Sequence, residues 1–124
     1  MDVKVVDTSA LAALLFGEPE AEAIAAQLAG ARLVAPALLA FELANVCLIK
    51  SRRHPEHRSV FLTAFGMRDR FGIEEVMVNH AEVVALAVET GLTAYDANYL
   101  WLARRLRADL VTLDKKLAKV AAGP

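Results

Sequence analysis

The chain has 124 residues, of which 56% are hydrophobic and 23% charged, and its formal net charge is −1. This length suits one domain, and the composition excludes a disordered chain. The near-neutral charge does not support a protein that binds nucleic acid through a broadly basic surface, although it allows a local basic patch. The apolar fraction is high for so short a chain, which is a hint of a surface that binds a second protein.

The single cysteine, Cys47, excludes an internal disulfide and favours a reducing compartment. No basic-then-apolar signal opens the chain, and no apolar run approaches the roughly 18 residues that suggest a membrane span. We therefore expect a cytoplasmic protein with no membrane partner. We also expect a single domain over residues 1–121, with residues 122–124 frayed.

Strand and helix patterns alternate in the first half of the chain. In chain order they are the strand 2–6, the helices 9–16 and 20–30, the strand 32–35 and the helix 36–53. Gly30 is the expected stop of the second helix, and Pro36 the expected start of the third.

The alternation continues after the interruption at His54-Pro55. The second half is expected to hold the helix 55–70, the strand 72–78, the helix that runs from its cap at Asn79 to Gly91, the helix 93–107, the strand 109–113 and the helix 115–119. Strands that alternate with helices predict a three-layer α/β/α sandwich with a central parallel sheet. Right-handed crossovers bring the carboxyl ends of all strands to one edge, where ligands bind.

Few of the acidic residues can reach that edge. Asp2 and Asp7 flank the first strand, roughly 16 Å apart at about 3.3 Å per residue, and only Asp7 lies at its carboxyl end. Asp114 follows the last strand in the same way. If the first and last strands are neighbours, Asp7 and Asp114 emerge together.

Two further acids lie on predicted helices. Asp96 is in the first turn of its helix, and Glu42 interrupts a largely apolar helix, with Asn45 three residues on and on the same face. Each acid also has a simpler interpretation, because Asp7, Asp96 and Asp114 suit helix caps and Glu42 suits a solvent-facing position. The two interpretations are compatible, since a capping carboxylate keeps a second oxygen.

Four converging carboxylates would repel one another at neutral pH unless a cation lay between them. Mg²⁺ and Mn²⁺ prefer oxygen ligands and would relieve this repulsion. Zinc is not favoured, because His54 and His57 are separated by Pro55 and lack further ligands.

Four segments extend over nearly the whole chain: V-V-D-T-S-A-L, P-A-L-L-A-F-E-L-A-N-V, L-T-A-Y-D-A-N-Y-L-W-L-A and A-D-L-V-T-L-D-K-K-L. With these segments in this order, the sequence resembles the PIN-domain nucleases, and more narrowly the VapC-type toxins of bacterial and archaeal toxin–antitoxin pairs. Each segment alone is a weak signal, whereas the four in order at this chain length are specific.

The resemblance implies a PIN-like, Rossmann-like fold and a metal-dependent endoribonuclease that uses one or two Mg²⁺ or Mn²⁺ ions. It implies four catalytic acids, which are Asp7, Glu42, Asp96 and Asp114. Glu42 would be a metal ligand or the group that orients water, and Asp114 occupies the most variable position. The expected metal ligands are Asp7, Asp96 and Asp114. The expected supporting polar residues are Ser9 and Thr112, together with Asn45, which shares a helix face with Glu42.

The resemblance also implies an RNA substrate, a homodimer and a small VapB-like antitoxin whose tail enters the active-site groove. Lys115, Arg52 and Arg53 are candidates to bind RNA phosphate, although the run 52–58 also suits a solvated helix end. Two rival functions stay open, a phosphoacceptor receiver domain and a PIN-like binding subunit without activity. A phosphatase of the D-x-D type is excluded by Ser9.

Several other residues have packing as the simpler interpretation. Cys47, Tyr95 and Tyr99 are expected in the core rather than in a binding role. For Trp101, the sequence leaves open whether the ring packs inside or meets a partner.

Overall fold

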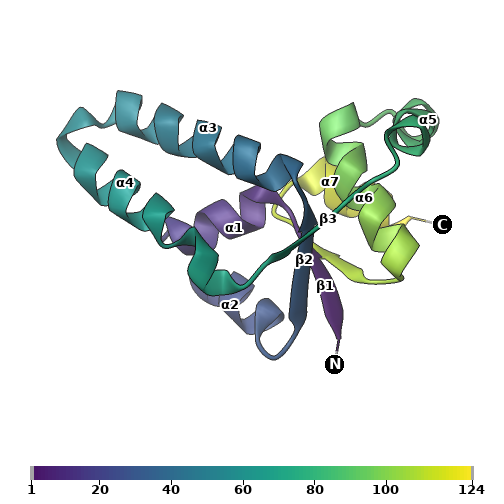
Figure 1. Ribbon diagram of the computed structural model, residues 1–124, viewed down its shortest axis with the longest axis horizontal. Helices are drawn as coiled ribbons and strands as arrows, with labels where there is room; N and C mark the ends of the chain where they lie inside the picture. Colours follow the sequence, from purple (N-terminus) through teal and green to yellow (C-terminus); the bar gives the residue numbers. More distant parts are fainter. Residues whose placement is uncertain (1, 124) are drawn as a thin grey trace.

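The computed structural model describes residues 2–123 as a four-stranded sheet with helices on both faces (Figure 1). All strand pairings are parallel, in the order β3-β2-β1-β4. The strands are β1 (Val3–Val6), β2 (Arg32–Pro36), β3 (Glu74–Val76) and β4 (Asp109–Val111). The expected three-layer α/β/α sandwich with a central parallel sheet is confirmed.

The helices form two layers, α1 to α4 on one face of the sheet and α5 to α7 on the other (Figure 1). Their bounds are α1 (Thr8–Leu15), α2 (Ala21–Leu28), α3 (Leu38–Arg53), α4 (Arg58–Gly66), α5 (His80–Thr90), α6 (Ala94–Leu106) and α7 (Lys115–Ala122), with 3₁₀ turns η1 (Pro55–His57) and η2 (Arg68–Phe71).

The order of the strands explains the two layers. The chain moves outward from β1 to β2 and β3, and then returns to the other side of β1 to form β4. Because parallel crossovers are right-handed, this reversal places the later helices on the opposite face. The reversal between β1 and β4 is also the point at which open α/β sheets bind ligands, outside the carboxyl ends of the strands.

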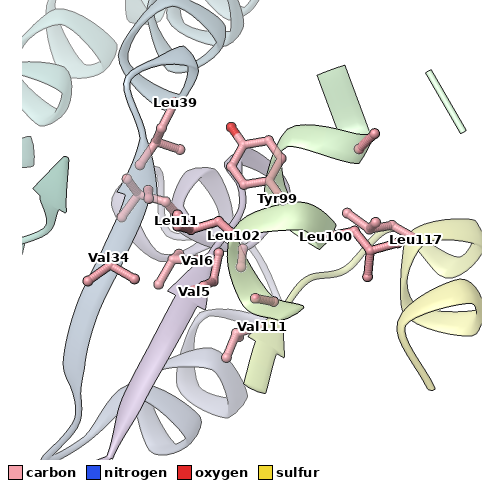
Figure 2. Close-up of a cluster of buried hydrophobic side chains, with 14 of the residues drawn as sticks. Val5, Val6, Leu11, Val34, Leu39, Tyr99, Leu100, Leu102, Val111 and Leu117 are labelled. Atoms are coloured by element: carbon pink, nitrogen blue, oxygen red, sulfur yellow. The ribbon is translucent and has the colours of Figure 1, made fainter. Parts of the chain in front are cut away.

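Buried apolar side chains join the layers on both sides of β1. Val5 and Val6 face opposite sides of the sheet and both are fully buried, as expected for a central strand of a covered parallel sheet. Figure 2 shows this core, to which β2, α1, α3, α6, β4 and α7 also contribute; the labelled residues are Val5, Val6, Leu11, Val34, Leu39, Tyr99, Leu100, Leu102, Val111 and Leu117.

Several element boundaries differ from those expected. Pro36 does not start the third helix but is the last residue of β2, paired with Val76, and α3 begins at Leu38. A proline is tolerated there because the strand ends and no further ladder bond requires its missing N–H. The helix expected over 55–70 is divided into η1, α4 and η2, and α4 ends at Gly66, a poor helix former.

Strand β4 is shorter than the predicted 109–113, because Thr112 leaves the ladder and bonds through its side chain. Helix α7 is longer than predicted and includes Ala122. Pro124 of the expected frayed segment lies outside the described residues. Within residues 2–123, none of the helices has the length and hydropathy that a membrane crossing requires.

Candidate active site

A cleft of about 260 Å³ opens at the carboxyl edge of the sheet, where β1 and β4 end. All four acids expected at the site line it, and they come from four different places in the chain. The lining residues are Asp7, Thr8, Ser9, Ala12, Glu42, Val46, Asp96, Tyr99 and Asp114. The parallel pairing of β1 with β4 brings the loops after these strands together, as the sequence argument required.

Asp7 is the buried member of the group, with 5% of its surface exposed. Its Oδ1 atom accepts hydrogen bonds from the backbone N–H of Ala10 at 3.0 Å and from the Ser9 hydroxyl at 2.7 Å, while Oδ2 accepts one from the Thr112 hydroxyl. Asp7 is therefore both the N-cap of α1 and part of the cleft. Burial raises the pKa of this carboxyl, and the charge of Asp114 adds to the effect, while the three hydrogen bonds oppose it.

Asp114 is tied to Asp7 through the loop that follows β4. Its Oδ1 atom caps α7 by accepting from the backbone N–H of Leu117 at 2.9 Å. Its own backbone N–H donates to Oγ1 of Thr112 at 3.0 Å, and the neighbouring N–H of Leu113 donates to Oγ of Ser9 at 2.8 Å. The two hydroxyl groups that hold Asp7 thus also hold the loop that carries Asp114.

Glu42 enters the cleft from the second turn of α3, where it is half-buried. Its Oε1 atom accepts hydrogen bonds from the hydroxyls of Thr8 at 2.8 Å and Tyr99 at 2.6 Å. Burial and the Glu42 carboxylate raise the pKa of Tyr99 above its ordinary value, so the tyrosine hydroxyl stays protonated and donates. Sequence reasoning missed Thr8 and Tyr99 as site residues. A signal existed, since Tyr99 lies one helical turn beyond Asp96.

Asp96 is the fourth carboxylate, in the first turn of α6. The Thr93 hydroxyl caps this helix by accepting from the Asp96 N–H at 3.1 Å, so the cap is Thr93 and the Asp96 carboxylate remains available. Burial is the largest cause that raises the pKa of Asp96, and the charges of Asp114, Glu42 and Asp7 raise it further, while the charge of Lys116 lowers it. The four acids are therefore close enough to repel one another.

The donor chemistry of the cleft suits a hard divalent cation, because it consists of carboxylate and hydroxyl oxygens and carries an excess of negative charge. Within residues 2–123, no three acidic, histidine or cysteine side chains converge closely enough to surround an ion in their present rotamers. Mutual repulsion keeps carboxylates apart when nothing neutralises them. The backbone nevertheless brings all four acids to one cleft.

The residues expected to bind substrate lie in different places. Lys115 is exposed at the first position of α7, beside Asp114, and pairs with no carboxylate among the described residues. Lys116 is the lysine whose charge acts on Asp96, and its Nζ donates to the carbonyl of Gly91 at 2.9 Å. Arg52 and Arg53 lie at the far end of α3, roughly 15 Å along the helix from Glu42 at about 1.5 Å per residue.

Asn45 is exposed on α3 and does not line the cleft, where Val46 takes part instead. Its side chain makes no hydrogen bond with any other residue that the structure describes.

The expectations for the packing residues are met in two of three cases. Cys47 and Tyr99 are buried as predicted, although Tyr99 also directs its hydroxyl to Glu42. The expectation for Tyr95 is wrong, because this ring is 63% exposed. Trp101 is half-buried between α5 and α6, and its indole N–H donates to Oε1 of Glu82 at 3.2 Å.

A larger cleft, about 530 Å³, lies along β4 between α6 and α7. Its charged side chains are Lys4, Arg104, Arg107 and Asp109. One carboxylate among cations cannot supply the ligand set that a catalytic metal needs. The chemistry of the lining therefore identifies the smaller cleft as the candidate active site.

Known proteins resemble this chain over most of its length. Residues 4–123 match the family model of the PIN domain. Ribonuclease VapC3 from Pyrobaculum aerophilum is 33% identical over 120 residues, which cover 93% of this chain and 92% of that protein. The crystal structure of PAE2754 from Pyrobaculum aerophilum aligns with a TM-score of 0.76 and 27% identity, covering 94% of this chain and 82% of that one.

Proposed function

We propose that this chain, which belongs to the PIN domain family, is a VapC-type toxin, an endoribonuclease that hydrolyses RNA phosphodiesters with the help of a divalent metal ion. The observation that carries the proposal is the cleft lined by Asp7, Glu42, Asp96 and Asp114 at the end of β1 and β4. The expected assignment to the PIN-domain ribonucleases of the VapC type is confirmed by the family match and by the likeness to Ribonuclease VapC3.

The proposed cofactor is Mg²⁺ or Mn²⁺, as one or two ions. Asp7, Asp96 and Asp114 would hold it, each with an oxygen ligand. When bound, such an ion supplies an activated water and stabilises negative charge on the phosphoryl group and the leaving oxygen. The exposed neighbour Lys115 is proposed to bind a substrate phosphate, and Arg52 and Arg53 are proposed to contact RNA further from the scissile bond.

The side chains of the protein have three proposed tasks in this reaction. Asp7 is fixed by three hydrogen bonds, so its carboxylate is presented in one orientation. Glu42 orients the attacking water or adds a further oxygen ligand. Ser9 and Thr112 keep the ends of β1 and β4 together and thereby preserve the spacing between Asp7 and Asp114. No side-chain nucleophile is needed, because water attacks the phosphorus in line.

The two rival functions have less support. A receiver domain needs an acidic pair after the first strand, but Asp7 is followed by Thr8, and β3, the third strand in the chain, ends at Val76 without an acid. A binding subunit without activity has no need for four carboxylates that repel one another in one cleft.

We further propose a cytoplasmic homodimer that is inhibited by a small VapB-like antitoxin. Exposed apolar side chains on both layers support binding to proteins. Phe41 is 75% exposed beside Glu42, which suits an antitoxin tail that enters the cleft. Val84 and Val88, on one face of α5, are 56% and 82% exposed and suit a second copy of the chain. Accordingly, Val88→Asp should yield a monomer in analytical ultracentrifugation, whereas Phe41→Asp should weaken antitoxin binding and leave the dimer.

Cleavage of defined RNAs tests the function. The native chain is expected to cleave with Mg²⁺ or Mn²⁺ and to stop when a chelator is added. Asp7→Asn should remove cleavage without unfolding the protein, and Asp2→Asn, at the opposite end of β1, should cleave as the native chain does. Cleavage that persists in the chelator would overturn the metal dependence, and full activity of Asp7→Asn would overturn the site.

A further inference from the structure

We infer that Tyr99 and Thr8 are positioning residues, which hold the Glu42 carboxylate in one orientation so that a single oxygen remains free to act in the cleft. The inference rests on the proposed function, because the carboxylate that they hold belongs to that site. In this inference, neither hydroxyl contacts RNA or metal, and both act by holding Glu42.

The hydrogen bonds at Glu42 are concentrated on one oxygen. Oε1 accepts from both hydroxyls, at 2.8 Å from Thr8 and 2.6 Å from Tyr99, and these hydroxyls are themselves 2.9 Å apart. Oε2 accepts no hydrogen bond from the described residues. The carboxylate therefore has one occupied oxygen and one free oxygen, which is the asymmetry needed to direct a carboxylate at a water or an ion.

The three residues come from both helical layers. Thr8 and Glu42 belong to α1 and α3 on one face of the sheet, and Tyr99 belongs to α6 on the other (Figure 1). The ring of Tyr99 is only 1% exposed and packs in the core, with its hydroxyl oxygen at the outer end of the side chain (Figure 2). The hydrogen bond from Tyr99 thus spans the carboxyl edge of the sheet and joins the layers at the cleft.

The same bonds relate Glu42 to two other acids. Thr8 directly follows Asp7, and Tyr99 lies one helical turn after Asp96. A flexible glutamate side chain has several rotamers and would otherwise move independently of both aspartates. The hydrogen bonds from the two hydroxyls fix the Glu42 carboxylate relative to the two helices that begin near Asp7 and Asp96. Such outer hydrogen bonds tune catalytic carboxylates because they reduce the reorganisation that the reaction requires.

A structural explanation competes with this inference. A buried tyrosine usually needs a hydrogen-bond partner, so Glu42 could serve only to satisfy Tyr99. The two explanations predict different results. If the bond serves stability alone, its loss lowers the melting temperature, but the folded protein keeps its kcat. If it positions Glu42, kcat falls even under conditions in which the variant is fully folded.

The kinetic experiment measures kcat and KM for four variants at temperatures at which all of them are folded. Tyr99→Phe and Thr8→Val each remove a hydroxyl and are expected to lower the cleavage rate about 10- to 100-fold with little change in KM. Thr8→Ser keeps the hydroxyl and should retain most of the activity. Tyr95→Phe is the matched control, because it removes an exposed hydroxyl from the same helix and should cleave as the native chain does. An unchanged rate in Tyr99→Phe would overturn the inference.

A double-mutant cycle shows whether Tyr99 acts through Glu42. In a Glu42→Gln background, Tyr99→Phe should change the remaining rate by much less than in the native background, since the group that it positions has been replaced. Equal effects in both backgrounds would show that Tyr99 acts elsewhere and would contradict the inference.

Crystal structures of the native chain and Tyr99→Phe supply a measurement that does not depend on activity. The Glu42 carboxylate should have one conformation in the native chain and a rotated or divided conformation in the variant. An unchanged Glu42 would contradict the inference. If the native chain cleaves no RNA, the proposed function fails, while this comparison still decides whether Tyr99 holds Glu42.

Discussion

The hydroxyl of Thr112 donates a hydrogen bond to Oδ2 of Asp7, and this bond joins the loop after β4 to the end of β1. The two residues are far apart in the chain, yet β1 and β4 are parallel neighbours, with Val6 paired to Val111. Thr112 also accepts from the backbone N–H of Asp114 at 3.0 Å. One threonine therefore sets the relative position of two acids in the candidate active site.

Replacement of Thr112 by valine tests this relationship. The change keeps the shape of the side chain but removes the donor to Asp7 and the acceptor for the Asp114 N–H. Because both partners are partly withdrawn from water, we expect the free energy of unfolding to fall by about 1–3 kcal/mol, as measured by urea denaturation. Thr63→Val, at an exposed position of α4, serves as the control. Equal stability of the two variants would show that the Thr112 bonds contribute nothing.

The raised pKa of Asp96 predicts a pH-dependent effect on stability in the absence of metal. In the folded chain this carboxyl keeps its proton at pH values where the unfolded chain, with the ordinary pKa of 3.8, has released it. Since the folded state then binds more protons, its stability falls as the pH rises from about 3.8 through the raised pKa.

Asp96→Asn removes this ionisation. We expect the variant to unfold with a higher free energy than the native chain at neutral pH, and the difference should shrink as the pH approaches 3.8. Urea denaturation in a chelator across this pH range measures the difference. A difference that does not change with pH would refute the assignment of the repulsion to Asp96.

A divalent metal ion should relieve the repulsion between the carboxylates of the cleft and stabilise the folded state. If Mn²⁺ or Mg²⁺ binds only the folded state, the free energy of unfolding rises by about 2.7 kcal/mol when the metal concentration is one hundred times the dissociation constant. Circular dichroism should therefore show a higher melting temperature for the native chain, which a chelator restores to its original value. Asp7→Asn should show a much smaller shift. An equal shift in both proteins would place the metal elsewhere.

Salt dependence can separate the proposed RNA contacts. Lys115 is adjacent to Asp114, so Lys115→Ala should raise the KM for RNA and lower the slope of log affinity against log salt by about one. Arg53→Ala should change cleavage of a short RNA much less, because Arg53 lies at the far end of α3. Fluorescence anisotropy with RNAs of two lengths measures both effects. If Arg53→Ala has the larger effect on a short RNA, the proposed path of the substrate is wrong.

Local patterns were sufficient to predict most of the fold. The strands β1 and β2 and the helices α5 and α6 are found where alternation and the cap at Asn79 predict them, because caps and apolar spacing are local signals. The end of β4 differs from the prediction at a point where a distant contact decides. Strand β4 ends at Val111, and the Thr112 hydroxyl donates to Asp7. No local property of the segment 109–113 indicates this.

The candidate site shows the same division. The four acids could be selected by their positions relative to predicted strands and by the resemblance of their segments. The hydroxyls of Thr8 and Tyr99 could not, because their role depends on α1, α3 and α6 meeting at one point. Tyr95 and Tyr99 lie four residues apart on α6, yet one ring is exposed and the other lies in the core.

By itself, the sequence determined the alternating α/β architecture, the acids at the ends of strands and the likeness to the PIN-domain ribonucleases, since these depend on residue type, order and spacing. Only the tertiary structure decided that β1 and β4 are neighbours, that Asp7 is at once a buried helix cap and part of the cleft, and that Glu42 is held from both layers. The physical reason is that hydrogen bonds and charge repulsion act over a few ångströms in space, and spacing along the chain does not specify which residues reach that distance.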